Sequence, residues 1–130
     1  GQKRVLALLP NAYMQGHTAG VNMAGGNEVF GKAIPMNSIG FFGLHIMTAG
    51  TYEGEMYEEK SDSTLKRLFT KDGLLKGFIL IGKTERAGIY TSLIRERTPL
   101  DTIDFETMKK VATSVAFSPE NRRKKFGGVV

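Results

Sequence analysis

The stretches with a strand-like pattern lie together in the middle of this chain, and the helical patterns lie before and after them. Strand-like stretches cover about residues 36–49, 51–59, 64–70 and 74–82, and a Lys-Asp-Gly turn joins the last two. Strands that are separated from helices along the sequence indicate an α+β fold, because alternation would be needed for a parallel α/β sheet. The sequence therefore predicts an antiparallel sheet of about four strands with helices on one side, preceded by one helix.

The first helical pattern runs from about residue 11 to residue 23. Pro10 precedes it and suits a first turn, where a missing N–H group costs nothing. Small residues recur at every fourth position on one face: Ala12, Gly16, Gly20 and Ala24. Each glycine inside a helix costs about 1 kcal/mol relative to alanine. We therefore expect another backbone to approach this face closely, and we expect the helix to end at Gly25 and Gly26.

The predicted strands and later helices carry further local signals. Gly40 and Gly43 weaken residues 36–49 as a regular strand and predict a bulge or a close contact there. Residues 74–82 are apolar on both faces, which is typical of a central, covered strand. Thr84 is a predicted N-cap of the next helix, and Asp104 is a predicted N-cap of the last one, whose apolar positions run to residue 115.

The composition removes several kinds of chemistry. The chain has no cysteine, which excludes disulfides, thiolate metal sites and cysteine nucleophiles within it. Only two histidines are present, His17 and His45, and each is interpreted as structural. No apolar run approaches the roughly 20 residues of a membrane span. We expect no metal site, no catalytic side chain and no membrane span, and a cytoplasmic location.

Charge is distributed unevenly along the 130 residues. The net charge is +5, from 18 basic and 13 acidic residues, but residues 1–50 carry only three basic residues and one acidic residue. A free surface normally carries charges of both signs. The first 50 residues are therefore expected to pack against something outside this chain. The basic run Arg122–Lys125 indicates a solvated tail rather than a nucleic-acid site, because no aromatic residues alternate with it.

Residues 77–84, Gly-Phe-Ile-Leu-Ile-Gly-Lys-Thr, match the P-loop pattern letter by letter. A P-loop must leave the N–H groups of its middle residues free to face phosphates. Here those middle residues are the most strand-like run in the chain, and a sheet would consume the same N–H groups. We therefore reject a P-loop. No Gly-x-Gly-x-x-Gly dinucleotide fingerprint is present either.

Two stretches resemble a known family. Residues 8–25, Leu-Leu-Pro-Asn-Ala-Tyr-Met-Gln-Gly-His-Thr-Ala-Gly-Val-Asn-Met-Ala-Gly, resemble the helix near the end of the FAD domain in FAD-dependent pyridine nucleotide (disulfide) oxidoreductases. Residues 75–90, Leu-Lys-Gly-Phe-Ile-Leu-Ile-Gly-Lys-Thr-Glu-Arg-Ala-Gly-Ile-Tyr, resemble a segment of their C-terminal domain. The similarity is greatest to the branch of the NADH:rubredoxin reductases and nitrite reductase flavoproteins.

The resemblance implies a role for the start of the first helix. In that family the helix directs its N-terminus at the flavin pyrimidine ring, which places Leu9, Pro10, Asn11 and Ala12 in the cofactor-binding region. Unpaired N–H groups and the positive end of the helix dipole stabilise the negative charge of a reduced flavin. The resemblance further implies three parts: residues 1–32 as the end of a FAD domain, residues 33–117 as an α+β interface-type domain, and residues 118–130 as a basic tail.

The family pattern is incomplete in this chain. The Gly-Asp motif and both dinucleotide fingerprints are absent, so the chain by itself is expected to bind no cofactor and to have no activity. The resemblance implies that a longer parent uses FAD and NAD(P)H to pass electrons to an acceptor, such as a redox protein. The His-Pro-Thr segment of the disulfide reductases is missing, which favours electron transfer over thiol exchange.

Two functions remain open at this point. The first is a C-terminal fragment of an FAD-dependent NAD(P)H oxidoreductase, which packs against the rest of the parent flavoprotein and forms a homo-oligomer. The second is a non-enzymatic interaction module that dimerises. Both predict self-association of the isolated chain through residues 5–50, whose apolar surface would be open.

Overall fold

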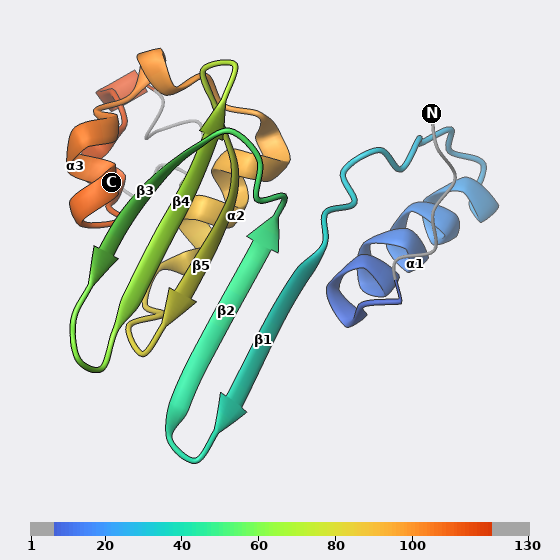
Figure 1. Cartoon of the computed structure of the whole chain (residues 1–130). Helices are drawn as coiled ribbons and strands as arrows, with labels where there is room; N and C mark the ends of the chain where they lie inside the picture. The colour runs from blue at the N-terminus through green and yellow to red at the C-terminus, as the bar shows by residue number, and fades with distance from the viewer. Residues whose placement is uncertain (1–6, 121–130) are drawn as a thin grey trace.

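The computed structural model of the chain describes residues 7–120. It contains one antiparallel sheet of five strands in the order β1-β2-β5-β4-β3, with helices beside it (Figure 1). The strands are β1 (Met36–Phe41), β2 (Leu44–Gly50), β3 (Glu55–Lys60), β4 (Leu65–Lys71) and β5 (Leu74–Ile81). The helices are α1 (Leu9–Met23), α2 (Ala87–Glu96) and α3 (Phe105–Lys110), with short 3-10 turns η1 (Leu100–Thr102) and η2 (Ser114–Ala116). The predicted α+β class is confirmed, while the basic run Arg122–Lys125 lies outside the described residues.

The stretch 36–49 is a hairpin rather than one strand. Strands β1 and β2 pair in antiparallel register from Met36 opposite Ala49 to Phe41 opposite Leu44. Phe42 and Gly43 form the two-residue connection, with φ of 45° and 81°. Two successive positive φ angles produce the turn that matches the twist of paired strands. The prediction of a bulge is therefore wrong, and the sheet has five strands instead of about four.

Strand β5 lies at the centre of the sheet, as the sequence predicts. It pairs with β2 on one side and with β4 on the other. Phe78 and Leu80 are buried on the face that α2 covers, whereas Ile79 and Ile81 on the opposite face are only half-buried. The expectation that this strand is covered is met on one face only, because within residues 7–120 the helices that contact the sheet lie behind it (Figure 1).

Helix α2 supplies most of the contact between the helices and the sheet. Its Tyr90 and Leu93 are buried against β5, and the Tyr90 hydroxyl donates a 2.7 Å hydrogen bond to the carbonyl of Met108. The helix has no side-chain cap, and its N-cap residue, Arg86, has a φ of 61°. The prediction of a Thr84 cap is therefore wrong. The helix begins further along the chain, and Thr84 takes part only through its carbonyl, which accepts from the N–H of Ala87.

Helix α3 starts where the sequence predicts and ends early. The Asp104 carboxylate accepts a 3.0 Å hydrogen bond from the N–H of Thr107, which confirms the cap. The helix stops at Lys110, because Val111 is extended, with φ of −139° and ψ of 117°. The apolar pattern out to Val115 therefore does not belong to one helix.

Helix α1 is attached by two asparagines. Asn11 donates through Nδ2 to the carbonyl of Ile34 at 2.9 Å, and Asn22 exchanges two hydrogen bonds with the backbone of Glu28. The helix lies apart from the sheet on the β1 side (Figure 1). A Cβ atom added at Gly16 or Gly20 would meet nothing within 4 Å. The backbone that we expect against this face is therefore not among the described residues.

Candidate functional site

The four residues predicted to lie near a cofactor begin helix α1. Leu9 is 84% exposed, Pro10 and Ala12 are exposed, and Asn11 is completely buried. Leu8 occupies the N-cap position in an extended conformation and makes no side-chain capping bond. The end of this helix is therefore not closed by any described side chain, which leaves its positive dipole end without a side-chain acceptor there.

Not every one of the four predicted residues has a free backbone N–H group at this helix end. Pro10 has no N–H group, and the N–H of Ala12 donates to the carbonyl of Leu8 at 3.0 Å. The N–H groups of Leu9 and Asn11 remain, because they belong to the first turn and have no intrahelical acceptor. An uncapped helix end with an exposed donor at Leu9 fits a group that carries partial negative charge. Among the four predicted residues, Leu9 is thus the exposed one whose N–H group can donate to such a group, because Asn11 is completely buried.

The Asn11 side chain is used for packing. Its Nδ2 holds Ile34, and its Oδ1 is the one buried side-chain polar atom in residues 7–120 that lacks a hydrogen-bond partner. A buried acceptor without a donor is costly and therefore unusual. The side-chain amide of Asn11 thus attaches α1 to the segment before β1 through its nitrogen, while its oxygen accepts no hydrogen bond.

The two histidines do not form a site. His17 and His45 are both exposed, and the carbonyl of His45 accepts from the N–H of Gly82 at 2.8 Å. No group of three or more His, Cys, Asp or Glu residues in the described part of the chain is arranged to hold a metal ion.

Most of the segment that matches the P-loop pattern forms part of the sheet. Residues 77–81 are part of β5, and their backbone pairs with both β2 and β4. The N–H groups of these residues are therefore engaged in the ladder. The rejection of a phosphate-binding loop at this segment is confirmed.

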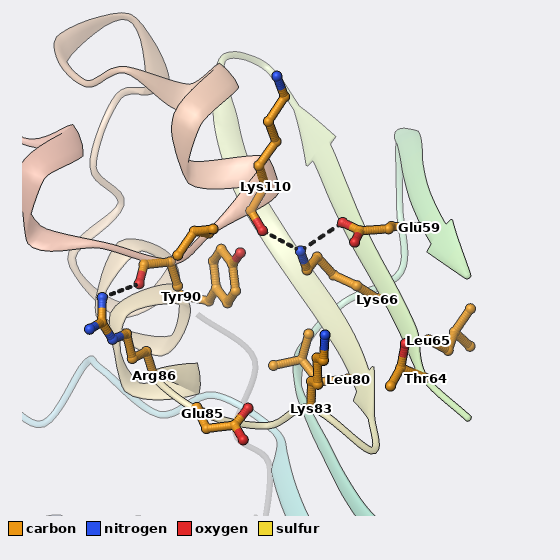
Figure 2. Close-up of a pocket in the computed structure, with 12 residues that line it drawn as sticks. Glu59, Thr64, Leu65, Lys66, Leu80, Lys83, Glu85, Arg86, Tyr90 and Lys110 are labelled. Carbon is orange, nitrogen blue, oxygen red and sulfur yellow. Dashed lines mark hydrogen bonds and ion pairs between the residues drawn. The ribbon is translucent and has the colours of Figure 1, made fainter. Parts of the chain in front are cut away.

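A second candidate region is a cavity of about 260 Å³ where the end of β5 and the start of α2 meet β4 and the segment after α3 (Figure 2). Its inner wall includes Leu80 and Tyr90, which are each 2% exposed. Four cationic side chains and two carboxylates also line it: Lys66, Lys83, Arg86, Lys110, Glu59 and Glu85. The wall is thus apolar at the bottom and cationic at the rim.

Lys66 is fully engaged in this wall. Its ammonium donates to the Glu59 carboxylate at 2.9 Å and to the carbonyls of Lys109 and Lys110 at 3.0 and 2.8 Å. The hydrogen bond and charge of Lys66 hold the pKa of Glu59 below its ordinary value. This ion pair joins β3 and β4 to the end of α3, and it leaves Lys66 no free donor for a ligand.

The other cations differ in where they point. The Lys110 side chain extends away from the cavity, whereas the Lys83 amine points in among the lining residues (Figure 2). Arg86 lies at the edge, and one of its N–H groups donates to the carbonyl of Ala112 at 3.4 Å. Burial raises the pKa of Tyr90 to about 12, so this phenol stays neutral beside the cations.

This cavity is absent from the sequence-based predictions. Its lining comes from β3, β4, β5, the loop after β5, α2 and the segment that follows α3. No local spacing joins those segments. The one signal in the sequence is the charged run from Lys83 to Arg86, directly after the most apolar strand.

No protein-family model matches this sequence. The chain is similar to the NADH-dependent phenylglyoxylate dehydrogenase subunit epsilon of Aromatoleum evansii. The two are 36% identical over a region that covers 77% of this chain and 26% of that protein. The chain thus spans about a quarter of the length of this curated relative. In the described part of the chain, the helices are too short or too polar to cross a membrane.

Proposed function

We propose that this chain is part of an NADH-linked oxidoreductase. The observation that carries the proposal is its 36% identity, over 77% of its residues, to a protein named as a subunit of an NADH-dependent dehydrogenase. The similarity covers only 26% of that relative, which leaves ample length for the nucleotide-binding units that this chain lacks. Under this proposal, residues 1–32 end a FAD domain and residues 33–117 form the following α+β domain.

The finer part of the proposal concerns FAD. A bound FAD would supply two-electron chemistry between the nicotinamide and a further acceptor, such as a redox protein. This chain's own contribution is the open N-terminus of α1. There the N–H group of Leu9 and the helix dipole favour a cofactor edge that gains negative charge on reduction.

The remaining contribution is packing against the rest of the parent or a second subunit. Large apolar side chains are exposed on α1, on the segment that follows it and on the β1–β2 turn: Leu9, Tyr13, Met23, Val29, Phe41 and Phe42. Exposed apolar residues in this number mark an interaction surface. They support the expectation that residues 5–50 face the parent flavoprotein or another copy of the chain.

The decisive experiment starts with the coding region around this segment. We expect an upstream reading frame with two Gly-rich strand–turn–helix units, and the purified full-length product should carry flavin that NADH bleaches anaerobically. A coding region that starts immediately before residue 1 would instead support a non-enzymatic interaction module. A full-length product without flavin would refute the FAD part while leaving the NADH-linked class open to a separate NADH-binding measurement.

A further inference from the structure

The outer edge of strand β1 carries an inference about a partner of this chain. We propose that β1 pairs in antiparallel register with β1 of a second copy, so that two five-stranded sheets join into one sheet across a two-fold axis (Figure 1). The pairing rests on the proposed function only in making specific the contact of residues 5–50 with another copy. Its failure would therefore leave the NADH-linked class standing.

The hydrogen-bond pattern of the β1–β2 hairpin defines which backbone groups of β1 face outward. The two-residue turn makes Phe41 and Leu44 a hydrogen-bonded pair, and such pairs recur at every second residue of an antiparallel ladder. The N–H of Gly50 donates to the carbonyl of Pro35 at 2.8 Å, which agrees with this alternation. The groups that face away from β2 therefore belong to three residues: Met36, Ser38 and Gly40. Within residues 7–120 these outward groups have no hydrogen-bond partner.

The two edges of the sheet differ in how well they resist pairing with another strand. Charged side chains on an edge strand hinder such pairing. Strand β3, at the other edge, has four charged residues among its six: Glu55, Glu58, Glu59 and Lys60. Residues 33–44, which include all of β1, carry no charge. Pairing β3 with its own copy would bring carboxylates of the two copies close together, whereas pairing β1 with its own copy brings no charges together.

Symmetry and exposed apolar side chains favour a second copy as the occupant. Two copies of one edge strand related by a two-fold axis can pair only in antiparallel orientation, which is the orientation of every pair in this sheet. Ile39 lies in one row with Ile46 and Ile81, on the face of the sheet that α2 does not cover, and it is 56% exposed. Pairing across the axis would bury Ile39 of one copy against Ile39 of the other.

The attachment of α1 restricts the register. Hydrogen-bonded pairs form only where outward-facing residues lie opposite each other. An axis at Ile39 places Ser38 of each copy opposite Gly40 of the other, which gives about four backbone hydrogen bonds. An axis at Ser38 would instead bring the turn of the second copy against Ile34, whose carbonyl already accepts from Nδ2 of Asn11 at 2.9 Å. Strand β1 runs away from that attachment, so the axis lies at Ile39 (Figure 1).

Disulfide trapping tests this register. The chain has no cysteine, so a single Ile39→Cys variant can form a disulfide only with another copy. The two Cα atoms at the axis would lie about 4.5 Å apart, within the range of roughly 4.4–6.8 Å that disulfides need. Asn37→Cys is the control on the same face, where the two positions would lie more than about 10 Å apart. Ile39→Cys should cross-link at least about tenfold faster at equal oxidant and chain concentration, and equal rates would overturn the pairing.

Hydrogen exchange of the unmodified 130-residue chain tests the pairing without any variant. Between about 20 µM and 1 mM, a range suited to a small interface, monomers should give way to dimers in sedimentation equilibrium. Exchange of the Ser38 and Gly40 amides should then slow at least about tenfold, while the Ile39 and Phe41 amides are protected by β2 throughout. A chain that stays monomeric at about 1 mM, or a dimer whose Ser38 and Gly40 amides exchange as fast as in the monomer, would overturn the proposal.

A matched pair of variants at Ser38 checks the outward donor. Ser38→Pro removes an N–H group that faces away from β2, so the ladder within the hairpin keeps its bonds, whereas Ser38→Ala keeps that donor. The dissociation constant of the dimer should rise at least about tenfold with proline and by less than about threefold with alanine. Equal dissociation constants for the two variants would contradict the pairing, and the exchange measurement stands whether or not either variant folds.

Discussion

Tyr90 connects the sheet, α2 and α3 through one side chain. It is 2% exposed, its ring lies 5.7 Å from that of Phe78 between centroids, and its hydroxyl donates to the carbonyl of Met108. Tyr90→Phe leaves this buried carbonyl without its donor, so we expect a loss of about 1–3 kcal/mol in the free energy of unfolding. Urea denaturation measures it. Tyr13→Phe, at a 76% exposed position, is the matched control and should change stability by less than about 0.5 kcal/mol.

The same phenol makes stability depend on pH at the alkaline end. Burial raises the pKa of Tyr90 to about 12, above the ordinary value of 10. The folded state therefore keeps this proton more tightly than the unfolded state does. Its contribution is fully present below pH 10 and is lost as the pH rises from 10 towards 12. Unfolding free energies between pH 9 and 12 should thus fall more steeply for the wild-type chain than for Tyr90→Phe, and parallel curves would contradict this assignment.

Leu9 offers a residue-scale test of the cofactor proposal in the full-length parent. Its side chain is 84% exposed at the first position of α1, so Leu9→Glu should fold without difficulty. A carboxylate there would oppose the negative charge of a reduced flavin by an amount on the order of 1 kcal/mol, and the flavin midpoint potential should fall. Gln15→Glu adds the same charge about one and two-thirds turns further along the helix and should shift the potential less. Equal shifts of the midpoint potential in the two variants, or no shift in either, would show that this helix end does not lie near the flavin.

At the scale of elements, two turns with the same backbone have very different signals in the sequence. Asp72 and Gly73 have φ of 56° and 68°, and the sequence predicts their hairpin correctly because Asp-Gly is a favoured pair for that turn. Phe42 and Gly43 adopt nearly the same conformation, yet phenylalanine is not a turn residue, so the sequence predicts no hairpin there.

The class of fold is predictable because periodicity and order along the chain specify it. The cavity is not predictable, since its walls meet only after the sheet and α2 have assembled.

The Phe42 turn leads to a prediction about β1 and β2. Phe42 is 95% exposed and holds a positive φ, which costs a phenylalanine about 1–2 kcal/mol and an asparagine less. Phe42→Asn should therefore stabilise the isolated chain by about 0.5–1 kcal/mol in thermal unfolding. Phe42→Val removes the same exposed ring but tolerates positive φ poorly, so it should destabilise the hairpin. If both variants behave alike, the loss of the ring rather than the backbone decides the result.

At the scale of the whole molecule, helix α1 has a face of small residues that no residue between 7 and 120 covers. Among its described residues only Asn11 is buried, and two asparagines hold the helix to the chain. A side chain at Gly16 or Gly20 would find empty space within 4 Å of its Cβ atom, although each glycine weakens the helix by about 1 kcal/mol. These two glycines lower the stability of the helix and contact nothing among the described residues. Their presence is explained if a parent domain or a second subunit approaches this face of α1.

The variant Gly16→Leu should have opposite effects in the isolated chain and in the full-length parent. In the isolated chain the leucine would meet nothing and would favour the helix, so α1 should gain up to about 1 kcal/mol, measured by helical circular dichroism and amide exchange. In the full-length parent the same side chain should collide with the approaching backbone, at a cost of about 1–3 kcal/mol, and lower folding yield or flavin content. Gln15→Leu is the control on another face of α1 and should be tolerated in both settings. Tolerance of Gly16→Leu in the parent would show that no backbone packs there, and it would remove the reason for placing a FAD domain against this helix.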